Sequence, residues 1–538
     1  MNREPVEEYD YIIVGSGAAG AVVASRLAAA TKASICVLEA GDSDRHPLVR
    51  IPAGFVKNLN NPARTWQFRS VAGDNTAGRQ VHLPQGKILG GSTSINGLIY
   101  NRGQAADFDS WAALGNTGWS YQDVLPYFRR SESRAGEESQ YRGAHGELRI
   151  SNPSQQHPLC DAFISAMADQ GLPTHNDYNA EAQRGTGYYQ RFIHGRTRET
   201  VARAMLAPAA RKFGIDVHTG ALVTKIHFSQ RRAIAVDVRQ NNASRQLRAR
   251  REIILSAGTV NTSRLLELSG VGQAERLTAL GIPLVHDLPG VGENFQDHYF
   301  VRLAARLKAG TSTLNSQAKG WRLLREIARW SLGQPSILTW SPSIAYAFIN
   351  ASDPAANPDL QFVFSHGSYK PGRVYELDDF PAITCGFTQQ RPESRGYVHI
   401  TSPDIDQPPE VQPNYLSTDN DQRLAVDGIR LARKIMGHAV FQPWFEREEA
   451  PGEDLQRDSE LLDYARRTGN TGYHLVGTCT MGPATQKTAV VSPELKVHGL
   501  QGLRVIDASV MPAVTSSNTC AASIMIGEKG ADLVIADA

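Results

Sequence analysis

The chain has 538 residues, of which 41% are hydrophobic and 20% are charged, as in an ordinary globular protein. This length exceeds what one compact core usually holds, so we expect two intertwined domains. The 56 basic and 54 acidic residues leave a net charge of +2, which argues against nucleic acid or an acidic surface as a partner.

The cysteines and the apolar segments indicate the cellular compartment. Five cysteines are scattered with no C-x-x-C pair, a pattern typical of free thiols in a reducing compartment, which predicts neither a disulfide frame nor a metal site. Residues 1–8 lack the apolar core of a secretion signal. No apolar stretch approaches the ~20 residues of a membrane span. We expect a cytoplasmic protein, and peripheral attachment to a membrane stays open.

The first forty residues organise the rest of the chain. Tyr9–Val14 is an apolar run with no polar face, which predicts a buried parallel strand. The G-x-G-x-x-G that follows suits a tight turn into a helix. Gly15 allows the turn, Gly17 lets backbone approach a pyrophosphate, and Gly20 permits close packing of helix and strand.

A helix, a second strand and an acid complete this unit. The alanine-rich segment Ala18–Ala30 predicts a helix whose N-terminal N–H groups and dipole attract phosphate. Ser34–Leu38 predicts the second strand, and Glu39 follows it, 19 residues after Gly20, where a ribose-binding carboxylate belongs. An acid there favours an unphosphorylated ribose, so we predict a site for FAD or NAD. The fingerprint does not choose between these two.

Gly86–Gly97 is a second segment dense in glycine and serine. Its accessible backbone N–H groups could hold a flat polar ring system. An ordinary glycine loop is an equal alternative for this segment taken alone.

The middle of the chain leaves the first sheet and returns to it. Thr200–Leu206 opens a helix, and Ile215–Ile226 predicts a pair of strands. Arg251–Gly258 predicts a buried strand that ends at a turn of small residues, and the following helix at Thr262–Leu268 adds one more unit to the sheet. The basic stretch Arg245–Arg251 resembles a solvated strand edge rather than a binding patch.

Residues 300–460 predict a different kind of sheet. Trp321–Trp330 has helical spacing. Three apolar runs, Tyr346–Phe348, Leu360–Phe364 and Ala382–Phe387, predict strands of an antiparallel sheet that forms the wall of a substrate chamber.

Two segments near the C-terminus indicate an enzyme. One is Thr471–Gly482, which contains His474. In the other, the strand Leu503–Ile506 ends at a corner of small residues where backbone can meet a cofactor. A helix is predicted at Ala521–Ala536, and its positive dipole end would stabilise negative charge on a cofactor.

Taken together, these motifs resemble the glucose–methanol–choline (GMC) flavin oxidoreductases, nearest to the bacterial choline-dehydrogenase and alcohol-dehydrogenase branch. The likeness covers essentially the whole chain. It rests on the two C-terminal segments and on Gly15–Glu39, Gly86–Gly103, Ser256–Val260 and Gly290–His298.

The resemblance implies an α/β fold in which a Rossmann-like FAD-binding domain is built from discontinuous segments. These are residues 1–150, 200–300 and 465–538. It also implies an α+β substrate domain with an antiparallel sheet, formed by residues 151–199 and 301–464.

The resemblance also assigns cofactor-binding residues. The ADP part of FAD is expected at Gly15, Gly17, Gly20 and Glu39, with Val223 meeting adenine through its backbone. The flavin is expected between one group comprising Gly91, Asn96 and Gly97 and another comprising Asp507, Ala508, Asn518 and Thr519. Some family members attach FAD through a histidine where this chain has Ile95. Ile95 forms no such bond, so non-covalent FAD is expected.

His474 is the expected catalytic base, because imidazole accepts a proton near neutrality; the alternative is a structural core histidine. The family pairs it with a His or Asn two residues after Asn518, where this chain has Cys520. A thiol is a weak donor, so Cys520 is expected to line the pocket rather than carry a proton, and Asn518 could donate in its place. We expect His298 to serve packing, and His366 is given no chemical role.

The expected reaction is oxidation of a primary alcohol to its aldehyde by hydride transfer to flavin N5. No cluster of acids marks a site for a quaternary ammonium group, so aromatic or medium-chain aliphatic alcohols are favoured over choline. The electron acceptor is oxygen or a quinone. Alternatives are a choline-type or other polyol dehydrogenase, an FAD-containing lyase of the hydroxynitrile-lyase type, and an NAD-dependent dehydrogenase.

Overall fold

The opening strand–helix–strand unit forms where the sequence predicts it. In the computed structural model, which describes residues 7–134, 138–175, 177–241, 243–370, 373 and 376–538, β1 is Glu7–Val14, α1 is Gly20–Ala30 and β2 is Ile35–Leu38. The last four residues of β1 and all of β2 are buried, because a parallel strand inside a sheet has both faces covered.

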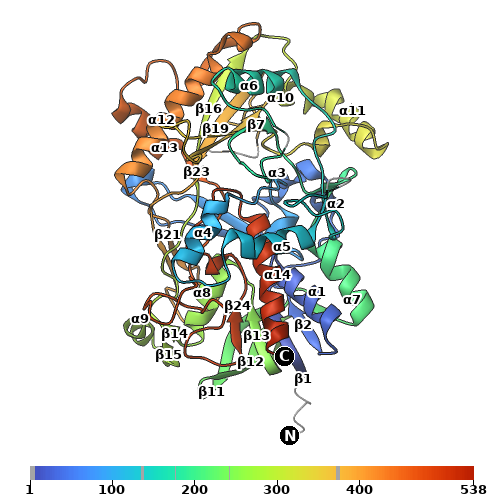
Figure 1. The fold of residues 1–538 in the computed structure, drawn as a ribbon, viewed down its shortest axis with the longest axis vertical. Helices are drawn as coiled ribbons and strands as arrows, with labels where there is room; N and C mark the ends of the chain where they lie inside the picture. The colour runs from blue at the N-terminus through green and yellow to red at the C-terminus, as the bar shows by residue number, and fades with distance from the viewer. Residues whose placement is uncertain (1–6, 135–137, 176, 242, 371–372, 374–375) are drawn as a thin grey trace.

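This unit belongs to a seven-stranded sheet in the lower half of Figure 1. The strand order is β10-β2-β1-β13-β12-β11, and β24 also pairs with β13. β1, β2, β10, β13 and β24 run parallel, whereas β11 and β12 are antiparallel to their neighbours. The further strands are β10 Asp216–His218, β11 Leu222–Ser229, β12 Arg232–Gln240, β13 Ala243–Leu255 and β24 Leu503–Val505.

The prediction of a strand edge at Arg245–Arg251 is wrong. These residues belong to β13, which pairs with β1 on one side and with β12 and β24 on the other. Exposed residues such as Arg248 and Arg250 alternate with buried Leu247 and Ala249. The polar positions therefore mark the solvated face of an interior strand, since successive side chains point to opposite faces.

Four further helices belong to this half of the molecule: α5 Tyr121–Ser131, α7 Ala207–Phe213, α8 Thr259–Leu268 and α14 Cys520–Ala536. α8 contacts β11, α7 contacts α1, and α5 contacts α14. α14 packs against α1. A Cβ at Gly527 would lie 2.8 Å from Cα of Ala19, so this glycine lets the two helices approach closely.

A second seven-stranded sheet lies in the upper half of Figure 1 and is antiparallel throughout. Its order is β22-β16-β19-β18-β17-β7, with β23 also paired to β16. The three predicted strands of this region are confirmed as β17, β18 and β19. The strands are β7 Gly185–Tyr188, β16 Tyr299–Leu307, β17 Ala345–Ile349, β18 Leu360–Ser365, β19 Ala382–Gln389, β22 Phe445–Ala450 and β23 Asn470–Thr471.

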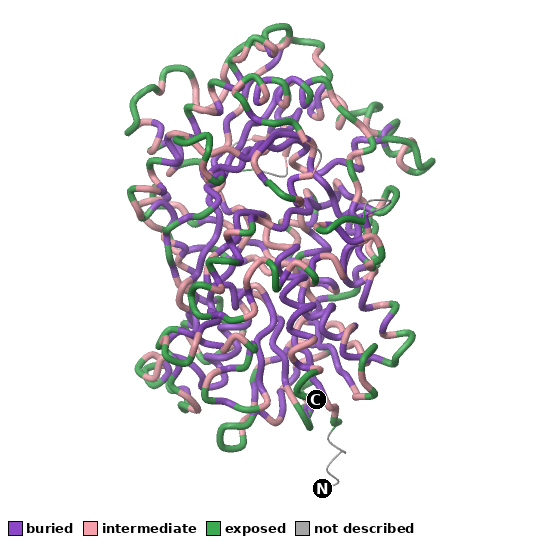
Figure 2. Tube along the Cα trace, in the orientation of Figure 1, coloured by how far each residue is buried: buried purple, intermediate pink, exposed green. Residues whose placement is uncertain are grey.

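The two faces of the second sheet differ in their partners. One face packs on α6 Pro158–Ala168 and α12 Asp419–Met436, and the side chains between them, such as Val301 and Phe362, form a core. The alternate residues point the other way and line a cavity. Figure 2 shows buried segments in both halves of the molecule, in keeping with the two largest apolar cores.

The strands do not follow the predicted domain bounds in every segment. β23 lies within residues 465–538, which were assigned to the cofactor domain, yet it pairs with β16 of the second sheet. The domain division itself stays a prediction. Within the described residues, no helix is both long and apolar enough to span a bilayer.

The remaining elements are short pairs and connecting helices. The strand pairs are β3 Thr65–Arg69 with β4 His82–Gly86, β5 Glu132–Arg134 with β6 Leu148–Ile150, β8 Ile193–His194 with β9 Thr197–Arg198, β14 Val271–Gly272 with β15 His286–Asp287, and β20 Tyr397–His399 with β21 Glu410–Gln412. The helices are α2 Pro47–Arg50, α3 Phe55–Asn58, α4 Ala105–Ala113, α9 Ala274–Ala279, α10 Leu314–Gln317, α11 Gly320–Ser331 and α13 Asp458–Thr468.

Candidate active site

A cavity of about 360 Å³ is lined by residues of both sheets. Val14 and Glu39 line it at the carboxyl ends of β1 and β2, where ligands bind in open α/β sheets. Phe300 on β16 and Thr388 on β19 line it from the second sheet. The cavity therefore joins the predicted nucleotide site to the wall of the predicted substrate chamber.

The three glycines of the opening turn have distinct surroundings. Gly15 has φ +99°, and a Cβ there would lie 2.3 Å from the backbone oxygen of Ser256. A Cβ at Gly20 would lie 2.1 Å from the Gly15 oxygen, so Gly20 serves helix packing and does not itself line the cavity. Gly17 lines the cavity and has open space around the missing Cβ. Backbone at Gly17 is thus accessible to a ligand.

Glu39 is buried at the end of β2 and fixes the turn. Its carboxylate accepts hydrogen bonds from Ser16 N (3.1 Å), Ser16 Oγ (2.6 Å) and Gly41 N (2.9 Å). Burial raises the pKa of Glu39, and these donors oppose that shift. Val223, on β11, also lines the cavity, and Ala221 N, just before this strand, donates to the backbone oxygen of Glu39 (2.9 Å). Of the residues predicted for the ADP part, the structure therefore brings all but Gly20 to the cavity wall.

The predicted flavin-flanking residues line the cavity as a set. Asp507 has its carboxylate engaged within the protein, accepting from Gly258 N (2.9 Å), Thr262 Oγ1 (2.6 Å) and Ser509 N (2.8 Å). It therefore ties the end of β24 to the start of α8. The other members are Gly91, Asn96, Gly97, Ala508, Asn518 and Thr519.

Arg198 is a buried cation that sequence reasoning missed. Its Nη1 donates to Asn96 Oδ1 (2.7 Å) and to the Thr93 oxygen (3.3 Å), which supports the segment between Gly91 and Gly97. Burial lowers the pKa of Arg198 to about 9. No local motif surrounds this arginine, because its partners lie a hundred residues earlier in the chain.

His474 lies in a turn whose backbone is strained. The preceding residue, Tyr473, has φ +65°, a backbone conformation that residues other than glycine rarely adopt. His474 N donates to Asp297 Oδ1 (2.8 Å), and Gly472 N donates to the His298 oxygen (2.6 Å). Tyr415 and Thr471 also donate hydroxyl protons to Asp297. The segment Gly290–His298 thus positions the turn that carries His474.

The side chain of His474 lies in a chain of hydrogen bonds that runs through His298 to the backbone oxygen of Gln390. The position of each proton in this chain follows from the Gln390 oxygen. His298 Nε2 lies 3.1 Å from the Gln390 oxygen, and a carbonyl oxygen only accepts, so Nε2 of His298 carries the proton. Neutral His298 then has a lone pair on Nδ1, which lies 2.8 Å from Nδ1 of His474. His474 must therefore donate from Nδ1, which leaves its Nε2 without a proton.

Asn518 completes this chain from the opposite side. Its Nδ2 lies 2.9 Å from Nε2 of His474, and an amide nitrogen donates to an unprotonated imidazole nitrogen. Oδ1 of Asn518 is buried and has no hydrogen-bond partner among the described residues. Asn518 and His474 both line the cavity, so a basic nitrogen and an unused amide oxygen meet there.

Burial keeps both histidines neutral. Desolvation lowers the pKa of His298 to about 4. Desolvation, and then the electrostatic cost of placing a second positive imidazole beside His298, lower the pKa of His474 well below its usual value. Burial raises the pKa of Asp297 to about 6, despite its hydrogen bonds. The neutral forms of the two histidines are those that the hydrogen-bond chain requires.

One expectation about this site needs revision: the sequence predicts that His298 serves packing, but it contacts His474 through a hydrogen bond. Asn518, the alternative donor to Cys520, is the residue that stands beside His474. Cys520 lines the cavity at the start of α14, and burial raises the pKa of its thiol to about 12. A neutral thiol fits the expectation that Cys520 lines the pocket.

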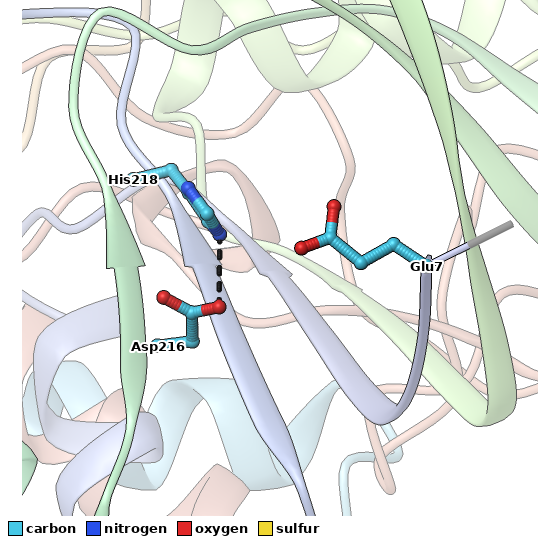
Figure 3. A group of neighbouring side chains, drawn as sticks. All are labelled: Glu7, Asp216 and His218. Atoms are coloured by element: carbon cyan, nitrogen blue, oxygen red, sulfur yellow. Dashed lines mark ion pairs between the residues drawn. The ribbon is translucent and has the colours of Figure 1, made fainter. Parts of the chain in front are cut away.

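A separate group of titratable residues lies at the edge of the first sheet. Glu7, Asp216 and His218 each offer an atom within 4.8 Å of the others (Figure 3). His218 Nε2 lies 3.1 Å from Asp216 Oδ2. Arg245 Nη1 donates to Glu7 Oε2 (2.6 Å), and Nη2 lies 3.3 Å from His218 Nδ1. This guanidinium already supplies the positive charge, so we assign no metal to the group.

The fold and the cavity define a class of protein: an oxidoreductase with a dinucleotide-binding sheet, a second sheet over the cavity and a histidine at its wall. The GMC oxidoreductase family models match residues 9–300 and 392–527. The chain belongs to this family. It is an FAD-dependent oxidoreductase that acts on CH–OH groups.

Relatives match nearly the whole chain. An oxygen-dependent choline dehydrogenase of Brucella canis is 36% identical over 532 residues, which cover 98% of this chain and 96% of the relative. One of Staphylococcus saprophyticus is 36% identical over 539 residues, covering 98% and 95%. The structure of pyridoxine 4-oxidase from Mesorbium loti superposes with a TM-score of 0.88 at 28% identity, covering 97% and 98%.

The residues of the cavity fit FAD. α1 and α14 begin at its wall without a side-chain N-cap, so their free N–H groups and positive dipole ends face the ligand. The space beside Gly17 offers a further contact, and so does Asn518 Oδ1, to which no described residue donates a hydrogen bond. The N-terminus of α1 is suited to bind the pyrophosphate, and the N-terminus of α14 is suited to stabilise negative charge on the flavin.

Proposed function

We propose that the protein oxidises primary alcohols, aromatic or medium-chain aliphatic, to aldehydes with non-covalently held FAD. The observation that carries this proposal is the unprotonated Nε2 of His474 at the cavity wall, which follows from its bond to His298. Bound FAD supplies the hydride acceptor. The protein must supply a group that removes the hydroxyl proton, and imidazole is suited to that task.

His474 takes the hydroxyl proton on Nε2. An alcohol hydroxyl that donates to Nε2 replaces the amide of Asn518, whose N–H then becomes free to donate to the substrate oxygen. As His474 gains its positive charge, its Nδ1–H stays hydrogen-bonded to the lone pair of His298. His298 is a positioning residue here, since it selects the tautomer of the base rather than touching the substrate.

The test of this role is His474→Ala, followed by anaerobic mixing of the yellow holoenzyme with a panel of primary alcohols. We expect flavin bleaching to slow by about 10²–10⁴-fold, the usual contribution of a general base. The control is His145→Ala, because that side chain is exposed. Near-normal bleaching in H474A would overturn the assignment. A wild-type flavin that stays yellow with every alcohol would favour the lyase instead.

The charged residues that line the cavity favour a neutral alcohol over choline as the substrate. The carboxylates that line the cavity among the described residues are Glu39 and Asp507, both engaged at the cofactor end. On β16 the wall presents Phe300 and Arg302, whose guanidinium lies 5.0 Å from the Phe300 ring. Within the described residues Arg302 has no ion pair with a carboxylate. It would repel a quaternary ammonium group.

Choline oxidation is the second candidate, supported by the names of the relatives. Measuring kcat/KM for benzyl alcohol, octan-1-ol and choline distinguishes the two candidate functions. We expect choline to be the poorest, and Arg302→Gln to improve choline relative to benzyl alcohol by about tenfold through loss of like-charge repulsion. Choline as the best wild-type substrate would refute our preference. Rapid return of flavin colour in air would identify oxygen as acceptor, and slow return would favour a quinone.

A further inference from the structure

Helix α11 (Gly320–Ser331) turns its apolar side toward solvent. Four of the seven exposed large hydrophobic side chains among the described residues lie in or just after it. Trp321, Leu324 and Ile327 follow one another at a spacing of three and are 66%, 68% and 43% exposed, and Leu332 is 74% exposed. Residues at this spacing share one face of a helix. In Figure 1 α11 projects at the upper right, beside rather than over the sheets.

The opposite side of α11 is held to the protein by polar contacts. Glu326 is buried; its Oε2 accepts from Ile337 N (3.1 Å), and its backbone oxygen accepts from Ser336 Oγ (2.9 Å). Trp330 Nε1 donates to the Arg196 oxygen (2.9 Å), and Arg196 Nη1 donates back to the Trp330 oxygen (3.0 Å). The helix is thus fixed with its acid inward and its apolar face outward.

Arginines flank the exposed apolar face. Arg322 and Arg325 lie beside Trp321, with their guanidinium carbons 6.0 and 5.5 Å from its ring centroid, and Arg329 follows Arg325 one turn later. Arg325 and Arg329 each also lie 3.5 Å from Oε1 of Glu326, and their side chains stay 51% and 39% exposed. Glu326, the acid of α11, is the buried one. A helix with tryptophan and leucine on one face and arginines beside it suits the boundary between headgroups and acyl chains. There the apolar side chains insert, and the guanidinium groups reach anionic phosphates.

We propose that α11 docks the protein on a bilayer that contains anionic phospholipid. Self-association through this face is disfavoured, because a two-fold dimer would bring the arginines of both copies together. The segment that follows α11 runs through the 3₁₀ turn Ile337–Thr339 to Pro342 and Ser343, which line the cavity. Docking would therefore hold the chain leading to the active site at the lipid surface, where a lipid-soluble alcohol or quinone is concentrated.

The test is co-flotation of the holoenzyme with vesicles of phosphatidylcholine, alone or mixed with phosphatidylglycerol. We expect binding to the mixed vesicles that weakens in high salt. The triple variant Trp321→Ser, Leu324→Ser, Ile327→Ser should bind at least about 100-fold more weakly, since it loses three insertable side chains. Arg322→Gln with Arg325→Gln should cost about tenfold or more.

Leu284→Ser and Leu114→Ser are the matched controls, because these exposed leucines lie outside α11. Both should bind like the wild type. Flavin absorbance and turnover with a soluble acceptor show that each variant is folded. Absence of wild-type binding to mixed vesicles would overturn the proposal, as would full binding by the triple variant. A wild-type dimer that the triple variant converts to a monomer, without vesicle binding, would identify a self-association surface and also overturn it.

Discussion

At the scale of single residues, the hydrogen bond between two buried histidines selects which nitrogen of His474 is basic. Replacing His298 with Phe removes the acceptor of the His474 Nδ1 proton, so the proton is free to move to Nε2 and block the base. We expect flavin reduction to slow by about tenfold or more, with little change in KM, because the substrate does not touch His298. Stopped-flow absorbance measures this rate, and His298→Asn, which retains an acceptor oxygen, should recover part of it.

The control for that variant is the same change at His366. This histidine is buried and stacks on His157, with ring centroids 4.1 Å apart, and it does not line the cavity. His366→Phe should leave the rate of flavin reduction per bound flavin unchanged. Equal losses in both variants would mean that any buried histidine acts through packing alone, and the positioning role of His298 would be refuted.

The pH dependence of flavin reduction reports the depressed pKa of His474. A base must be unprotonated to accept a proton, and an ordinary imidazole loses half of its basic form at about pH 6.5. Desolvation and the neighbouring His298 move the pKa of His474 well below that value. The reduction rate should therefore stay flat as the pH falls from 8 through 6.5, and decline only at more acidic pH. An inflection at or above 6.5 would contradict the burial argument.

At the scale of elements, the carboxylate of Glu39 joins the end of β2 to the turn after β1 by hydrogen bonds. Glu39→Gln keeps the size of the side chain but sets an amide N–H₂ among three donors from Ser16 and Gly41. At least one buried donor then loses its acceptor, which costs about 1–3 kcal/mol. We expect FAD affinity to fall by about tenfold or more, as measured by quenching of flavin fluorescence.

Asp42→Asn is the control for this change, because Asp42 is exposed three residues farther along the chain. It should bind FAD like the wild type. If Glu39→Gln also retains full affinity, the turn does not depend on this carboxylate, and its expected contact with ribose is unimportant.

Local patterns predict an element well when its neighbours in space are also neighbours in sequence. The strand at Tyr9–Val14, its glycine turn and α1 satisfy this condition, and each is found as predicted. The contact of His298 with His474 joins residues 176 positions apart, so no local signal reveals it. The spacing of Trp321–Trp330 predicts the helix α11 but not which side faces the protein. That depends on the distant partner Arg196 and on Glu326, whose burial runs against the usual preference.

At the scale of the whole molecule, we expect FAD to be held without a covalent bond, because of one side chain at the cavity wall. Ile95 lines the cavity and is buried, and its hydrocarbon side chain forms no bond to a flavin ring. Acid precipitation of the holoenzyme should therefore release all yellow colour into the supernatant. Ile95→His offers the nitrogen that other family members use, and some flavin retained in its pellet would support the assignment. Flavin retained in the wild-type pellet would refute it.

A cavity lined by both sheets makes the two halves of the molecule depend on the same ligand. FAD that spans from Glu39 to the strands β16 and β19 would be bound by the native state and not by the unfolded chain. Mass action then adds about 2.7 kcal/mol to the free energy of unfolding when free FAD is 100 times its Kd. The apoenzyme should melt at a lower temperature than the holoenzyme, and its Tm should rise with added FAD. FMN, which lacks the adenosine part, should raise the Tm far less, because it cannot use the site formed by Gly17, Glu39 and Val223. Equal stabilisation by FMN and FAD in calorimetry would show that the nucleotide end of the cavity contributes nothing to holding the two sheets together.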